Sequence, residues 1–280
     1  MARFKSFLDF YINSSIHVAF AVLSFCVLTA YELDLDSSLV FYSACFFASV
    51  AGYNFVKYFG FTKFYYRSLT TQLKYIQLVF VLSSIGFIYV FFQLQYHSQI
   101  LLVFLGLVTF FYAIPMGVRP PKNLRSIGGV KIYIIAFVWA VTTVVFPILE
   151  SNLSLNTDHW ILVIQRMFIV IVLMLPFEIR DLEVDQVHLS TIPQKIGIQN
   201  TKIIGYALLG DSILLEFFQH QFTQNSFLTV CFTGILTATF LAKSKKYQER
   251  YYAAFWVEAI PILALLFVVI LTLFQKTGSF

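Results

Sequence analysis

Long apolar stretches, each close to the length that a helix needs to cross a lipid bilayer, follow one another along most of the chain. A membrane-crossing helix takes roughly 20 mainly apolar residues. Only 12% of the 280 residues are charged, about half the share found in soluble domains. We therefore predict one all-α domain over residues 1–280, a polytopic integral membrane protein with about nine transmembrane helices bundled around a central cavity. The spans are expected near residues 14–31, 39–59, 75–93, 99–117, 130–149, 159–178, 202–219, 226–242 and 252–274.

The charged residues between these stretches alternate in sign along the chain. Seventeen of the 19 Lys and Arg residues fall at the N-terminus or in every second loop, whereas the other loops carry acidic residues such as Glu32, Asp34 and Glu150. Loops rich in Lys and Arg face the cytoplasm. This distribution predicts a multi-pass protein with a cytoplasmic N-terminus and an outside C-terminus, with its function on the cytoplasmic side.

The net charge of +5 does not indicate nucleic-acid binding, because the basic residues are spread over short loops and form no continuous stripe. The only partners that composition itself indicates are membrane lipids, and it leaves the oligomeric state open. Cys26, Cys45 and Cys231 lie inside apolar stretches without the spacing of metal ligands, so we interpret them as small buried hydrophobic residues.

The segment after the sixth predicted span carries the clearest sign of chemistry. If the helix continues, Glu178, Asp181 and Asp185 fall on one face, at positions i, i+3 and i+7. Carboxylates on one face repel unless a cation neutralises them, and Mg²⁺ is held by one or two carboxylates together with substrate phosphate. The spacing is equally compatible with a solvated acidic helix end.

The same segment resembles a known motif. Glu178-Ile-Arg-Asp181-x-x-x-Asp185, followed by Ser190-Thr-Ile-Pro193, looks like the second aspartate motif of the UbiA-type intramembrane prenyltransferase superfamily. The segment from Tyr112 to Lys122 is similar to that family's Tyr- and Lys/Arg-bearing stretch. The resemblance implies nine helices and cytoplasmic acidic motifs after the second and sixth, in agreement with the predicted spans.

The resemblance also implies a reaction, the transfer of a polyprenyl group from its diphosphate to an acceptor. Asp181 and Asp185 would then hold Mg²⁺ against the diphosphate of an isoprenoid substrate, with Glu178 as a third possible ligand. Metal and cations stabilise the departing diphosphate, and aromatic rings shelter an allylic cation. Further contacts to the substrate are expected from Asn54, Tyr58, Tyr112, Arg119, Lys122, Arg125 and Arg180.

The family's first motif, Asn-x-x-x-Asp-x-x-x-Asp, is only partly present. Asn54 matches its first position, but Tyr58 and Thr62 replace the aspartates, and residues 37–149 contain no Asp or Glu at all. Lys57 lies in this segment, and an ammonium can meet a phosphate as a point charge. One hypothesis is therefore a variant site with a single Mg²⁺, in which Lys57 replaces the other metal and joins Asp181 and Asp185 as a catalytic group.

Two alternatives follow from the missing aspartates and from ionisable residues inside spans. The first is a membrane protein that binds an isoprenoid or another lipid without turnover. The second is a transporter, since charged groups within spans are costly and often functional. The charged residues concerned are Arg166, Asp211, Glu216 and Glu258.

Overall fold

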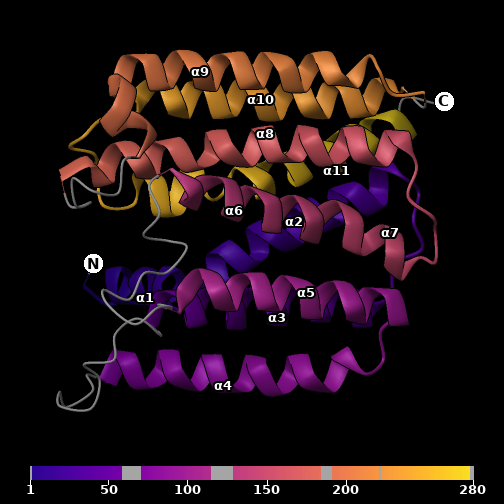
Figure 1. The fold of residues 1–280 in the computed structure, drawn as a ribbon, viewed down its shortest axis with the longest axis horizontal. Helices are drawn as coiled ribbons and strands as arrows, with labels where there is room; N and C mark the ends of the chain where they lie inside the picture. Colours follow the sequence, from indigo (N-terminus) through magenta and orange to yellow (C-terminus); the bar gives the residue numbers. More distant parts are fainter. Residues whose placement is uncertain (1, 59–70, 115–128, 184–190, 221, 278–280) are drawn as a thin grey trace.

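The computed structural model describes residues 2–58, 71–114, 129–183, 191–220 and 222–277, and in these ranges every regular element is helical (Figure 1). This confirms the predicted all-α class. The elements are α1 (Ala2–Asn13), α2 (Ile16–Glu32), α3 (Leu39–Tyr58), α4 (Thr71–Phe91), α5 (Tyr96–Ala113), α6 (Val130–Ala140), η3 (Val141–Val145), α7 (Phe146–Glu150), α8 (Thr157–Arg180), η4 (Asp181–Glu183), α9 (Ile192–Glu216), α10 (Gln224–Lys243), η6 (Tyr252–Val257) and α11 (Ile260–Thr277).

Each predicted span coincides with a helix or with a run of joined helices. Within the described residues, seven are long and apolar enough to cross a membrane by themselves, and α1 with α2 forms an eighth, bent by 59°. The ninth, α9, is less apolar because it contains Lys202, Asp211 and Glu216. The protein is therefore an integral, multi-pass membrane protein, and nine spans is an approximate count.

The long helices run side by side, and their ends sort into two groups (Figure 1). The last residues of α3, α5 and α8 and the first residues of α4, α6 and α9 lie at the same end of the molecule as α1. The C-terminus lies at the opposite end. We call the end that holds α1 the N-terminal face. That this face is the cytoplasmic one is still a prediction from the distribution of Lys and Arg.

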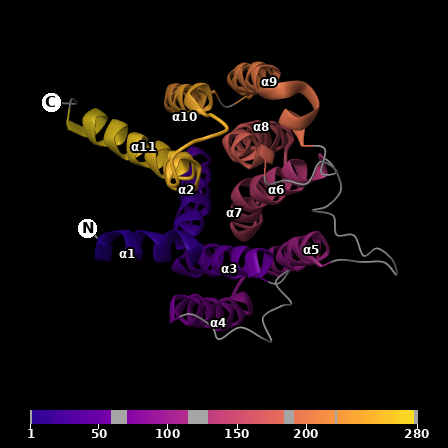
Figure 2. The same ribbon diagram turned by 90° about the vertical axis from the view of Figure 1, so that its left-hand side faces the viewer.

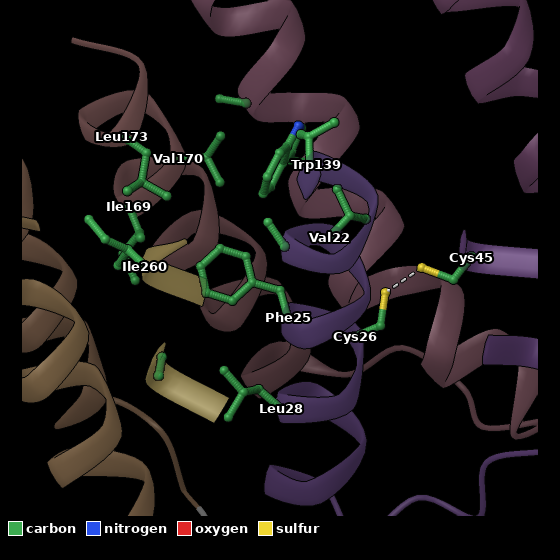
Figure 3. Packing of buried hydrophobic residues seen from close by; sticks show 14 of the residues in the cluster. Val22, Phe25, Cys26, Leu28, Cys45, Trp139, Ile169, Val170, Leu173 and Ile260 are labelled. Atoms are coloured by element: carbon green, nitrogen blue, oxygen red, sulfur yellow. Dashed lines mark hydrogen bonds between the residues drawn. The ribbon is translucent and has the colours of Figure 1, made fainter. Parts of the chain in front are cut away.

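Helix α2 lies near the middle of the bundle, where it packs against α3, α11 and η3 (Figure 2). Phe25, which is almost fully buried, points from α2 toward Ile169 on α8 and toward Trp139 on α6 (Figure 3). On the other side of α2, the thiols of Cys26 and Cys45 face each other with 3.0 Å between their Sγ atoms (Figure 3). Both are free and buried, as predicted, whereas Cys231 is only partly buried.

Two of the spans contain a π-helix. The span Val130–Glu150 changes from α6 to the π-helix η3 before Pro147 opens the short helix α7, and the last span begins with the π-helix η6. Proline has no N–H to donate to the preceding turn, and it stands here where the hydrogen-bond pattern changes from π to α. Such turns are rare and are often found at functional sites. Both of them adjoin the groups described next.

Candidate functional site

Asn54, the one residue that matches the family's first motif, connects α3 to the turn between α1 and α2. Its side-chain amide donates to the main-chain oxygen of Ser14 at 2.8 Å, and the Ser15 hydroxyl donates to its Oδ1 at 3.2 Å. Ser15 adopts the left-handed conformation, with φ at 63°. Because Asn54 is only 2% exposed and its amide is engaged on both sides, its contacts stabilise a bend in the chain.

Lys57 and Tyr58, one turn further along α3, continue this contact. Lys57 Nζ donates to the main-chain oxygens of Ile12 at 3.2 Å and Asn13 at 3.4 Å, and the Tyr58 hydroxyl donates to Asn13 O at 3.0 Å. The last carbonyls of a helix lack partners inside the helix and carry partial negative charge. Tyr58, at an aspartate position of the motif, and the neighbouring Lys57 therefore cap the end of α1.

On α8, the acidic residues of the second motif lie beside protein cations. Lys131 Nζ lies 2.8 Å from Glu178 Oε1, and Glu178 is 3% exposed. Arg180 donates from Nε and Nη2 to the two carboxylate oxygens of Asp181, at 2.6 and 3.0 Å. Each of these two carboxylates thus has a cationic partner from the protein itself.

The helix does not continue through the second motif. α8 ends at Arg180, Asp181 is its C-cap, and a short 3-10 helix extends to Glu183. Glu178 and Asp181 keep their spacing, whereas Asp185 lies outside the described residues, as do Arg119, Lys122 and Arg125. In the described part of the chain no three His, Cys, Asp or Glu side chains are grouped to hold a metal.

Asp181 nevertheless fits Mg²⁺ chemically. Its carboxylate is partly exposed, and Mg²⁺ usually takes only one or two protein carboxylates together with waters and substrate phosphates. Glu178 fits less well, because it is buried and already paired with Lys131. Of the two described carboxylates, Asp181 is therefore the one that could hold the ion, and its predicted partner Asp185 lies outside the described residues.

Glu258 is a further member of this site, from the last span. It follows the π-helix η6 and interacts electrostatically with Lys57 and with Arg180. Nearby, His17 bonds through its ring nitrogens to the Tyr11 hydroxyl at 3.2 Å and to the main-chain oxygen of Phe255 at 2.9 Å. The ends of α1, α3, α8 and η6 therefore meet around charged side chains at the N-terminal face.

A cavity of about 420 Å³ lies between α2, α3, α4, α5 and the α6–η3 span. Its wall is mainly apolar and aromatic, with Tyr53, Phe80, Phe87 and Trp139 among the lining residues. Trp139 Nε1 donates a hydrogen bond to the Tyr53 hydroxyl. The volume of the cavity falls within the usual range of about 300–1,000 Å³ for small-molecule pockets.

The cavity begins close to the charged end of α3. Phe55 and Val56 line it and directly precede Lys57, and Tyr112, predicted to contact substrate, lines it from the last turn of α5. The apolar cavity and the charged end of α3 thus lie within one helical turn of each other along this helix. Such an arrangement suits an amphipathic molecule with an anionic head and an apolar tail.

A second polar cluster lies nearer the opposite end of the molecule. Arg166, 4% exposed, donates to Thr29 at 3.2 Å and lies 3.9 Å from Glu32, with its guanidinium over the Phe25 ring. Glu216 accepts from Gln165 at 2.7 Å and also from Gln219 and Ser226. These partners could not be identified from the sequence.

The charged residues within spans do not form one line across the membrane. Asp211 is exposed on α9, Arg166 pairs with Glu32, and Glu258 belongs to the other end of the bundle. Among the described residues, no hydrogen bond or ion pair joins Arg166, Glu216 and Glu258 to one another. A continuous polar pathway, which transport would favour, is therefore not formed by these side chains.

Comparison with known proteins gives likeness in structure only. No protein-family model matches the chain, and no curated protein matches its sequence. Among solved structures, the apo form of a UbiA homologue from Aeropyrum pernix K1 is similar with a TM-score of 0.67 and 12% identity, covering 92% of this chain and 98% of its own.

Two further structures are similar over nearly the same length. A UbiA homologue from Archaeoglobus fulgidus bound to GPP and Mg²⁺ has a TM-score of 0.63 at 11% identity, with 93% and 97% of the two chains covered. A digeranylgeranylglyceryl phosphate synthase has a TM-score of 0.57 at 15% identity, with 96% and 98% covered. Since these likenesses cover more than nine tenths of the chain, it has the fold of the UbiA-type intramembrane prenyltransferase superfamily.

Proposed function

We propose that this protein is a divergent prenyltransferase, which transfers a polyprenyl group from a prenyl diphosphate to an acceptor at the cytoplasmic side of the membrane. The observation that carries the proposal is the apolar cavity, whose lining on α3 ends at Phe55 and Val56, next in sequence to Lys57 at the charged end of that helix. The cavity suits the prenyl chain, and the charged N-terminal face suits the diphosphate. One solved structure of the same fold holds GPP and Mg²⁺.

Lys57 is suited to bind a diphosphate oxygen directly. An ammonium has three N–H donors, and two of them reach Ile12 and Asn13. We propose that the third, in the field of Glu258, turns to a phosphate oxygen when the diphosphate binds. Arg180, partly exposed beside Asp181, offers a planar donor pair that matches phosphate geometry. These two cations offset the negative charge that grows as the bond between prenyl C1 and the diphosphate oxygen breaks.

Mg²⁺ bound at Asp181 and Asp185 would supply further positive charge to the leaving diphosphate. The carbon side of the breaking bond becomes electron-poor, and the faces of Tyr53 and Trp139 at the cavity wall attract such a charge. A prenyl chain that fills this mainly apolar cavity would leave little room for water beside the prenyl cation, which favours transfer to the acceptor over hydrolysis.

A second candidate, an isoprenoid- or lipid-binding protein without turnover, is favoured by the pairing of the carboxylates. Lys131 already neutralises Glu178 and Arg180 already neutralises Asp181. Without the aspartates of the first motif, a second metal has no carboxylates on α3 to bind it. This candidate predicts that prenyl diphosphate binds without Mg²⁺.

The test is the affinity of the purified protein for geranyl diphosphate, measured by calorimetry in detergent with and without Mg²⁺. We expect Mg²⁺ to tighten binding and the double variant Asp181→Asn/Asp185→Asn to lose at least about tenfold, the effect of one charge-assisted hydrogen bond or more. Asp211→Asn, an exposed carboxylate on α9, is the matched control. An affinity that changes neither with Mg²⁺ nor with replacement of the two aspartates would refute the proposed enzymatic activity and leave the lipid-binding role.

A further inference from the structure

Two glycines line the apolar cavity, Gly52 on α3 and Gly106 on α5. A Cβ atom added to either would meet no atom within 4 Å. Gly86 and Gly205 differ, because a Cβ there would lie 2.9 Å from Phe47 and 2.4 Å from Leu241. These last two are therefore glycines because helices pack closely against them, whereas Gly52 and Gly106 face empty space.

Backbone conformation does not explain the two cavity glycines either. In the described part of the chain, positive φ is found at only two glycines, Gly129 and Gly197. Gly52 and Gly106 lie inside regular helices, where glycine is less favourable than alanine. The physical effect of having glycine at both positions is the space that it leaves in the cavity.

The depth of the cavity can be expressed in prenyl units. Its lining extends from Val56 to Ala48 on α3 and from Tyr112 to Leu102 on α5. At about 1.5 Å per residue these stretches are roughly 12 and 15 Å long. An extended chain advances about 1.2 Å per backbone bond, so a prenyl unit of four such bonds spans about 5 Å. The cavity thus has room for about three units.

The two glycines lie at similar distances from the charged end of the cavity. Gly52 is five residues before Lys57 and Gly106 is six residues before Tyr112, which places them about 8 and 9 Å from the charged end. That distance corresponds to the second prenyl unit. A side chain at either position would leave room for the first unit and fill the space of the second.

We propose that Gly52 and Gly106 determine the prenyl chain length that this site accepts, and that the glycines admit a chain of about three units. The inference rests on the proposed function and adds a substrate class to it. The two residues determine specificity through the space they leave and take no part in bond breaking.

The test compares dimethylallyl, geranyl, farnesyl and geranylgeranyl diphosphate as competitors of a labelled geranyl diphosphate. For the wild type we expect affinity to rise up to the farnesyl chain and to level off beyond it. Gly52→Leu and Gly106→Leu should each bind dimethylallyl diphosphate as the wild type does and bind geranyl and farnesyl diphosphate at least about tenfold more weakly, since each methylene removed from contact is worth up to about fourfold. Gly52→Ala and Gly106→Ala should give intermediate losses and guard against a leucine variant that does not fold.

Gly210→Leu is the matched control, because Gly210 on α9 is exposed as Gly106 is and has no atom within 4 Å of an added Cβ, but is not among the residues that line the cavity. It should leave the order of affinities unchanged. If no prenyl diphosphate binds the wild type, the proposed function itself fails. If the wild type binds them and the leucine variants keep the same order of affinities, or lose dimethylallyl diphosphate while their thermal unfolding is unchanged, the role of the two glycines is refuted and the function stands.

Discussion

The ammonium of Lys57 donates a hydrogen bond to the main-chain oxygen of Ile12 across 3.2 Å and so joins the end of α3 to the end of α1. The three polar side chains at this end of α3 all reach the same turn, since Asn54 and Tyr58 bond to Ser14 and Asn13. Asn54 and Tyr58, which stand at two positions of the motif that the sequence resembles, thus hold the end of the N-terminal helix in place.

Tyr58→Phe removes one hydrogen bond to Asn13 O and should lower the free energy of unfolding by about 1 kcal/mol. Tyr58→Asp restores the family's residue, but it places a carboxylate beside helix-end carbonyls and should cost more. We expect it to add no Mg²⁺ affinity. Chemical unfolding in detergent and Mg²⁺ titration measure the two effects, with Lys74→Met, exposed on α4, as control. Tighter Mg²⁺ binding by Tyr58→Asp would contradict this expectation and would show that the contact with the end of α1 does not keep position 58 from binding the metal.

Lys131→Met should be strongly destabilising, because it leaves the buried carboxylate of Glu178 without its cation. Removing one partner of a buried ion pair costs about 3–5 kcal/mol, and because Lys131 is partly exposed we expect about 3 kcal/mol. The double variant Lys131→Met/Glu178→Gln should recover most of the loss, since no charge is left unpaired. Thermal unfolding of the single variants, the double variant and the exposed control Lys195→Met provides the measurement. A double variant as unstable as Lys131→Met would show that packing, and not charge, holds this position.

Gly205→Ala and Gly210→Ala should shift stability in opposite directions although both lie on α9. A methyl group at Gly205 would meet the fully buried Leu241 at 2.4 Å and Leu175 at 3.0 Å, so a cost of about 1–3 kcal/mol is expected. Gly210 faces open space, where alanine favours the helix by about 0.5–1 kcal/mol. The same chemical change in one helix thus separates packing from helix propensity. Equal shifts in melting temperature would contradict the close approach of α8, α9 and α10 at Gly205.

His220 lies between α9 and α10, outside the spans, and its ring Nδ1 lies 2.8 Å from Asp158 Oδ1. The hydrogen bond to Asp158 and its negative charge raise the pKa of His220 above the usual 6.5. The folded state therefore binds the proton more tightly, so the stabilising effect is complete below about pH 6 and is lost as the pH rises through the raised pKa. The effect is small because the ring is exposed.

The melting temperature between pH 5.5 and 8.5 tests this, with His220→Gln as the variant. The wild type should lose a small part of its stability toward high pH that the variant does not lose. Wild type and variant curves that stay parallel over this range would show that the contact to Asp158 contributes nothing.

The spans and the class of fold could be predicted because they depend on local composition. An apolar stretch such as 130–149 is long enough to cross a bilayer whatever its neighbours are, and it coincides with α6, η3 and α7. The end of α8 was harder to place, because nothing in the sequence near Asp181 prevents a longer helix. The bend between α1 and α2 depends on Asn54, about 40 residues further along the chain.

The candidate site could likewise be predicted only in part, because some of its contacts join residues that are far apart in sequence. Asp181 was identified from its motif, and its pairing with the adjacent Arg180 is a local contact. Glu258 was noted as a charged residue in a span, but its interaction with Lys57 and Arg180 joins three helices that are far apart in sequence. The structure adds that the Tyr58 hydroxyl caps α1 through Asn13, and the predicted contact of Tyr58 with substrate stays a prediction. The sequence contains no local signal for either relationship.

The two π-helices have a consequence for how this chain compares with others. A π-turn bonds residue i to residue i+5 and so takes up about one more residue than an α-turn. Two proteins can therefore have the same arrangement of helices although one of them has two additional residues, one near residue 141 and one near residue 252. In a sequence alignment without gaps, equivalent residues of two such chains are shifted by one position within these apolar segments. Few other residues there show where the gap belongs. For a protein of this kind, the similarity between two chains is therefore easier to detect by comparing their backbone structures than by comparing their sequences.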